Sequence, residues 1–87
     1  MAWALILARD AEKQLARLPR RDLERVARAL AAMRDDPYAG DVRRLVNLPR
    51  AFRRRVGDYR VQFDVDEDQK RVEVAAIERR SERTYRR

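Results

Sequence analysis

A Gly-Asp pair at residues 57 and 58 limits the fold of this chain more than any other sequence feature. It separates two runs of strand-forming residues, FRRRV (52–56) and YRVQFDV (59–65). Two-residue turns are the commonest connections of β-hairpins, so the pattern predicts an antiparallel hairpin. The turn also fixes the register, because each residue before the pair then faces one residue after it.

The predicted hairpin has one mainly apolar side and one basic side. Side chains alternate along a strand, so the apolar side holds Phe52, Arg54, Val56, Tyr59, Val61 and Phe63. We expect this side to face the core, with the head group of Arg54 extending to the core's edge. The basic side holds Arg53, Arg55, Arg60 and Gln62.

Like charges lie opposite one another on the basic side, since Arg55 faces Arg60 and Arg53 is two residues away. Such pairs destabilise a sheet by about a few tenths to 1 kcal/mol. An anion between the guanidinium groups would reverse the sign of this interaction, because arginine binds phosphate through bidentate, charge-assisted hydrogen bonds. We therefore predict a phosphate-binding face. The alternative is that these arginines are simply solvated.

Segments outside the hairpin have the patterns of two strands and two helices. We predict strands at 3–8 and 71–77, helices at 9–18 and 20–37, and an irregular segment at 38–51. The longer helix carries an apolar stripe of Leu23, Val26, Ala27, Leu30 and Met33, and Asp22 can cap its N-terminus. The order β-α-α-β-β-β predicts an α+β fold, with a helical hairpin on a mostly antiparallel sheet. A length of 87 residues predicts a single domain, 1–87.

Charge and composition point to a polyanionic partner. The net charge is +7, the pI is about 10.9, and Leu, Ile, Val and Phe make up only 20 of the 87 residues. So small a core makes a partner that covers apolar surface favourable. The N-terminal apolar run is too short to span a bilayer and lacks a basic leader, so we expect a cytoplasmic protein.

The chain contains neither histidine nor cysteine, which excludes imidazole acid–base chemistry, a thiolate nucleophile and the usual zinc ligands. Catalysis by geometry and electrostatics remains possible. RNA carries its own nucleophile, the 2′-hydroxyl, which a protein can align with the adjacent phosphate while arginines stabilise the developing charge. We expect this chemistry to need no metal and no cofactor, and to leave a 2′,3′-cyclic phosphate and a 5′-hydroxyl.

The C-terminal tail, 78–87, adds further basic residues and one aromatic residue. Its arginines are Arg79, Arg80, Arg83, Arg86 and Arg87, with Tyr85 among them. A basic patch beside an aromatic ring suits single-stranded RNA, whose bases can stack on the ring. A packing role for Tyr85 is the simpler alternative.

These features together resemble the RelE/ParE superfamily of toxin–antitoxin toxins. The similarity covers nearly the whole chain, from DAEKQLARLPR through a second helix ending in DDP to LVNLPRAFRRRVGDYRVQFDVDEDQKRVEVAAIERRSERTY. Its most specific part is R-x-G-D-Y-R, followed by a strand, an arginine and a late tyrosine. The resemblance implies a microbial-RNase-like fold and inhibition by a cognate antitoxin. For the RelE-like branch, which we favour, it also implies cleavage of mRNA in the ribosomal A site.

The resemblance also implies roles for individual residues. Arg60 matches the phosphate-stabilising arginine, Arg79 or Arg80 matches an arginine near the end of the last strand, and Tyr85 matches a base-stacking tyrosine. Arg53 and Arg55 lie where RelE-like toxins often carry basic residues. The residues expected to bind RNA are Arg53, Arg55, Gln62 and Arg83.

One departure from the family pattern concerns the general base. Well-known RelE toxins have lysines where this chain has Arg53 and Arg55, and arginine does not act as a base in proteins. Tyr85, Glu78 and Glu82 are the candidates that remain.

Three functions follow as hypotheses. The first is a ribosome-dependent mRNA endonuclease toxin. The second is a ParE-like toxin that inhibits DNA gyrase by binding and has no chemistry of its own. The third is a basic nucleic-acid-binding module without toxicity. For a toxin, we expect an acidic, partly disordered antitoxin that orders as it wraps the protein.

Overall fold

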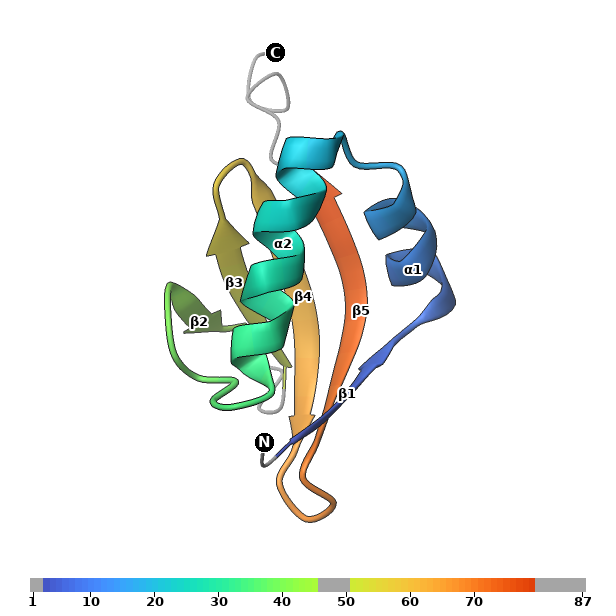
Figure 1. The fold of residues 1–87 in the computed structure, drawn as a ribbon. Helices are drawn as coiled ribbons and strands as arrows, with labels where there is room; N and C mark the ends of the chain where they lie inside the picture. Colours follow the sequence, from blue (N-terminus) through green and yellow to red (C-terminus); the bar gives the residue numbers. More distant parts are fainter. Residues whose placement is uncertain (1–2, 46–50, 80–87) are drawn as a thin grey trace.

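The computed structural model describes residues 3–45 and 51–79, which form one sheet covered on one face by two helices (Figure 1). In chain order the elements are β1 (Ala4–Leu7), α1 (Arg9–Ala16), α2 (Arg20–Met33), β2 (Val42–Arg44), β3 (Ala51–Val56), β4 (Tyr59–Asp66) and β5 (Arg71–Arg79). The strand order within the sheet is β1-β5-β4-β3-β2. The β1–β5 pair is parallel and the other pairs are antiparallel. The predicted α+β class and mostly antiparallel sheet are confirmed.

The β3–β4 hairpin has the predicted register. Val56 faces Tyr59, Arg55 faces Arg60, and the pairing continues to Phe52 opposite Phe63. Gly57 has φ +59°, and Lys70 is the only non-glycine residue with positive φ in the described chain. The first turn residue, Gly57, thus has a positive φ and the second, Asp58, does not. This combination is the pattern of a type II′ turn, which favours glycine at the first position.

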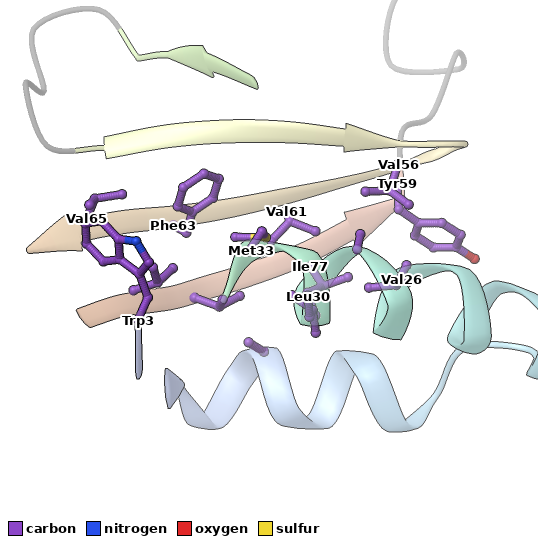
Figure 2. Close-up of a cluster of buried hydrophobic side chains, with 14 residues drawn as sticks. Trp3, Val26, Leu30, Met33, Val56, Tyr59, Val61, Phe63, Val65 and Ile77 are labelled. Carbon is purple, nitrogen blue, oxygen red and sulfur yellow. The ribbon is translucent and has the colours of Figure 1, made fainter. Parts of the chain in front are cut away.

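The core lies between the sheet and the two helices. Figure 2 shows side chains of α2 and of the strands pointing into this space, among them Val26, Met33, Val61 and Phe63. Phe63 is 1% exposed, and it stacks on Phe52 with ring centroids 5.7 Å apart. The predicted stripe on α2 is mostly buried, although Ala27 is exposed and Ala29 is buried in its place.

Three local predictions were wrong. The helix predicted to reach residue 37 ends at Met33, after which Arg34 donates its backbone N–H to the carbonyl of Ala31 in a final tight turn. Its N-cap is Pro19, whereas Asp22 lies within the first turn and makes no cap hydrogen bond. The segment 38–51, predicted to be irregular, contains β2 and the first residue of β3. The strand β2 has only three residues, VRR, which are too few to show an alternating pattern in the sequence. It is a strand because it pairs with β3.

Arg54 lies on the helix side of the sheet, as predicted, but its head group does not extend freely into water. The guanidinium packs beside Gly40, where a Cβ atom would lie 2.9 Å from Cζ. Gly40 has φ +90°, a conformation that favours glycine. The loop before β2 is therefore closed tightly against β3.

The face of the sheet opposite the helices is not covered by any helix of the described chain (Figure 1). Alternation along β3 and β4 places Arg53, Arg55, Arg60 and Gln62 on this open face. The sheet therefore separates an apolar helix side from a charged open side.

Candidate anion-binding site

Of the described residues, four arginines and one aspartate line a pocket of about 270 Å³ on the open face. They are Asp41, Arg43, Arg53, Arg55 and Arg60. Arg53 and Arg55 come from β3 and Arg60 from β4, while Arg43 comes from β2, where it pairs with Arg53. Three adjacent strands thus contribute to one positively charged pocket.

Asp41 is fixed at the pocket wall by the backbone. The N–H of Arg55 donates to the carbonyl oxygen of Asp41 over 3.0 Å. The side-chain pair is longer, with Nη1 of Arg55 3.9 Å from Oδ2 of Asp41, and both side chains are about half exposed. Within residues 3–45 and 51–79, the other three pocket arginines form no ion pair. Among the described residues, the pocket therefore carries an excess of positive charge, which favours an anion.

The arginines could hold a phosphodiester but could not exchange protons with it. Each guanidinium presents a planar set of donors that matches two phosphate oxygens, and it stays charged at any ordinary pH. Several such groups around one anion would stabilise the extra negative charge that develops on a phosphorane. Among the described residues that line the pocket, Asp41 is the only one whose side chain offers a carboxylate.

Of the residues singled out in the sequence, the structure brings Arg53, Arg55 and Arg60 together. Gln62 lies on the same face but does not line the pocket, and its Nε2 donates to Oε1 of Glu78 over 3.2 Å. Arg79 faces Tyr59 across the β4–β5 ladder, so its side chain begins on the helix side of the sheet, away from Arg60. Arg80, Glu82, Arg83 and Tyr85 lie outside the described residues.

Asp41 and Arg43 were not predicted to belong to the site. Both belong to the segment predicted to be irregular, so no face could be assigned to them. The one usable signal was the alternation DVR at 41–43, with a single apolar residue between two charged ones.

The end of the hairpin that carries Arg60 is tied to α2. The hydroxyl of Tyr59 donates to Oδ2 of Asp22 over 3.0 Å, and Tyr59 is 5% exposed. Burial, the hydrogen bond to Asp22 and the Asp22 charge all raise the pKa of Tyr59 above its ordinary value of 10.0. Asp22, predicted to be a helix cap, instead links the first turn of α2 to β4.

This link predicts a loss of stability at alkaline pH. Tyr59 must be protonated to donate to Asp22, so its contribution is complete below pH 10 and declines as the pH rises through its higher folded-state pKa. Tyr59→Phe should lower the unfolding free energy at pH 7 by about 1 kcal/mol, and should lose less additional stability above pH 10 than the wild type. Urea unfolding at pH 7 and at several pH values above 10 measures both effects.

Tyr38 supplies the control for this titration. Burial and its hydrogen bond to Glu67 raise the pKa of Tyr38 to about 12. Tyr38→Phe removes this second titration but does not touch the bond from Tyr59 to Asp22, so the alkaline loss that Tyr59 causes should remain. Equal alkaline losses in the wild type and Tyr59→Phe would contradict the assigned link.

Residues 5–84 match the model of the family described as "ParE toxin of type II toxin-antitoxin system, parDE". The chain belongs to this family. It is accordingly the toxin of a toxin–antitoxin pair. No curated protein matched it significantly.

Several solved structures have a similar fold. The ParE-family chain superposes on a chain of the archaeal RelE–RelB complex from Pyrococcus horikoshii OT3 with a TM-score of 0.84 and 23% identity, covering 94% of this chain and 99% of that one. For the isolated RelE toxin of E. coli, the TM-score is 0.81 and the identity 18%, with coverages of 92% and 86%. For the RelBE2 toxin–antitoxin complex of Mycobacterium tuberculosis, the values are 0.78 and 21%, with coverages of 92% and 100%. At these identities the likeness concerns the fold, which is RelE-like.

The described part of the toxin contains no helix that is long and apolar enough to cross a membrane.

Proposed function

We propose that this toxin is an mRNA endonuclease that acts on the ribosome without a metal ion. The observation that carries the proposal is the arginine pocket on the open face, where guanidinium groups from three strands surround a space of about 270 Å³. The volume of the pocket is close to that of the smallest ligand-binding pockets, roughly 300 Å³. That size suits a phosphodiester and an adjoining ribose better than a folded RNA surface.

The proposed reaction is an in-line transesterification. The 2′-hydroxyl of the nucleotide before the scissile bond loses its proton and attacks phosphorus, the bond from phosphorus to the 5′-oxygen breaks, and the 5′-oxygen takes a proton from water. The products are a 2′,3′-cyclic phosphate and a 5′-hydroxyl. Arg53, Arg55 and Arg60 would hold the phosphate and stabilise its developing charge. Translating ribosomes as the target would place the reaction in the cytoplasm.

Residues outside the pocket would have supporting roles in the reaction. Arg80 or Arg79 and the stacking residue Tyr85 would complete the catalytic set, while Gln62 and Arg83 would contact RNA. Arg79 begins on the helix side of the sheet, so we give it less weight than the three pocket arginines.

Inhibition of DNA gyrase is the second candidate function, because the matching family is described by the name ParE. Binding alone would then explain toxicity. It would not require several arginines to surround a single pocket, and this feature is why we place the endonuclease first.

We also propose that an acidic antitoxin binds this toxin. The net charge of +7 and the small core favour a partner that brings negative charge and covers apolar surface. Two of the solved structures with this fold are described as complexes of a toxin with its antitoxin or of RelE with RelB. An antitoxin segment that neutralises the arginine pocket would block the proposed RNA site.

The test is primer extension on ribosome-bound mRNA after addition of the toxin, with chemical analysis of the new ends. We expect discrete cuts whose downstream fragments carry 5′-hydroxyls and whose upstream fragments carry cyclic phosphates. A parallel supercoiling assay with DNA gyrase is the control. Intact mRNA together with inhibited gyrase would favour the ParE-like function, and no effect in either assay or on growth would favour a simple nucleic-acid-binding module.

A further inference from the structure

We infer that Asp41 is the general base of the proposed reaction, the group that accepts the proton of the attacking 2′-hydroxyl. This inference rests on the proposed endonuclease function. It assigns the step in which the 2′-hydroxyl loses its proton, which no arginine of the pocket can perform.

The geometry favours Asp41 because it is the only carboxylate among the described residues that line the pocket. Its backbone carbonyl accepts a hydrogen bond from the N–H of Arg55, which fixes the start of β2 beside β3. Its side chain is about half exposed, and the 3.9 Å separation from Arg55 is too long for a strong hydrogen bond. The carboxylate is therefore held at the pocket wall but remains able to turn toward a bound ribose.

The other described residues that line the pocket with Asp41 are all permanent cations. They are Arg43 on β2, Arg53 and Arg55 on β3, and Arg60 on β4. None of them gains or loses a proton at ordinary pH. A phosphate held by these arginines would bring its neighbouring 2′-hydroxyl to the same wall, and a carboxylate there can take up the proton as the bond from oxygen to phosphorus forms.

Glu78 is the rival carboxylate within the described residues, and its position is less suitable. It faces Arg60 across the β4–β5 ladder and lies on the open face, but it does not line the pocket. Its Oε1 already accepts a hydrogen bond from Nε2 of Gln62 at 3.2 Å. A substrate held between the arginines of β2, β3 and β4 could therefore transfer a proton more directly to Asp41 than to Glu78.

The experiment measures single-turnover cleavage of ribosome-bound mRNA, and separately the affinity for the same complex with a 2′-deoxy nucleotide at the scissile position. Asp41→Asn should cut at least about 100-fold more slowly, the usual contribution of a general base. It should bind the uncleavable complex at least as tightly as wild type, because the substitution removes a negative charge from the pocket. Asp41→Glu should retain most of the activity. The matched control is Asp64→Asn, which removes an exposed carboxylate of β4 outside the pocket and should cut at the wild-type rate.

Chemical rescue distinguishes a base from a residue that only positions Arg55. Added carboxylates should restore cleavage by Asp41→Ala, and acetate should restore more than formate because it is the stronger base. Equal rescue by both ions, or none, would assign Asp41 a positioning role and overturn the inference. Wild-type cleavage rates in Asp41→Asn, with a large loss in Glu78→Gln, would overturn it in favour of Glu78. If wild-type toxin itself leaves mRNA intact, the proposed function fails first and the inference fails with it.

Discussion

Replacing Arg60 by alanine is expected to slow mRNA cleavage by about 100- to 1,000-fold, the usual loss when one preorganised donor to a developing oxyanion is removed. Arg60 lies directly opposite Arg55 and lines the pocket, so its guanidinium can reach a phosphate held from the β3 side. Its removal also relieves repulsion between like charges, so stability should not fall. Primer extension gives the rate, and thermal unfolding verifies the fold.

Two further variants sharpen this prediction. Arg60→Lys keeps the charge but loses the planar pair of donors, so its rate should lie between those of wild type and Arg60→Ala. Arg28→Ala removes an exposed arginine from α2, on the helix side of the sheet, and should cleave at the wild-type rate. Equal losses in Arg28→Ala and Arg60→Ala would mean that only the overall positive charge matters, which would contradict a localised site.

Replacing Phe63 by alanine is expected to have the largest effect on stability. Phe63 is 1% exposed and stacks on Phe52 between the sheet and α2, so truncation leaves a cavity that the surrounding core cannot fill. Large-to-small changes of this kind cost about 3–5 kcal/mol. For a domain of this size that corresponds to a fall in Tm of roughly 4–8 °C per kcal/mol, which comes close to unfolding the protein.

Urea and thermal unfolding followed by circular dichroism measure this loss. The matched control is Ile6→Ala on β1, because Ile6 is 45% exposed and its truncation should change stability by less than about 0.5 kcal/mol. A small effect of Phe63→Ala would mean that the core repacks around the missing ring. It would also contradict our view that so small a core tolerates little loss.

Beyond the hairpin, the sequence predicted elements better than it predicted their ends or partners. The helices at 9–18 and 20–37 were correctly placed because apolar residues at helical spacing mark the face that packs on the sheet. The end of the longer helix was wrong by four residues, since Asp36-Pro37 marks a stop without fixing the last helical turn. The strand β2 was missed altogether.

Arg79 shows why the last strand was harder to interpret. Between β4 and β5 the register shifts at Gln62 and Phe63, where Phe63 pairs with Val74 and Gln62 pairs with Ala76. Ala75 is therefore extra, and the alternation changes phase beyond it. Counting from Val72 and Val74 without this bulge would put Arg79 on the open face, whereas the bulge puts it on the helix side.

The sequence by itself determined the register of the β3–β4 hairpin and hence the shared side of Arg53, Arg55 and Arg60. This was possible because a two-residue turn is local, and because alternation is a property of the strand backbone. Only the tertiary structure decided that Arg43 on β2 and Asp41 just before it help to form a pocket, and that a bulge turns Arg79 away. These features depend on pairing between segments far apart in the chain, whose register is set by packing and leaves no signal in a short run of residues.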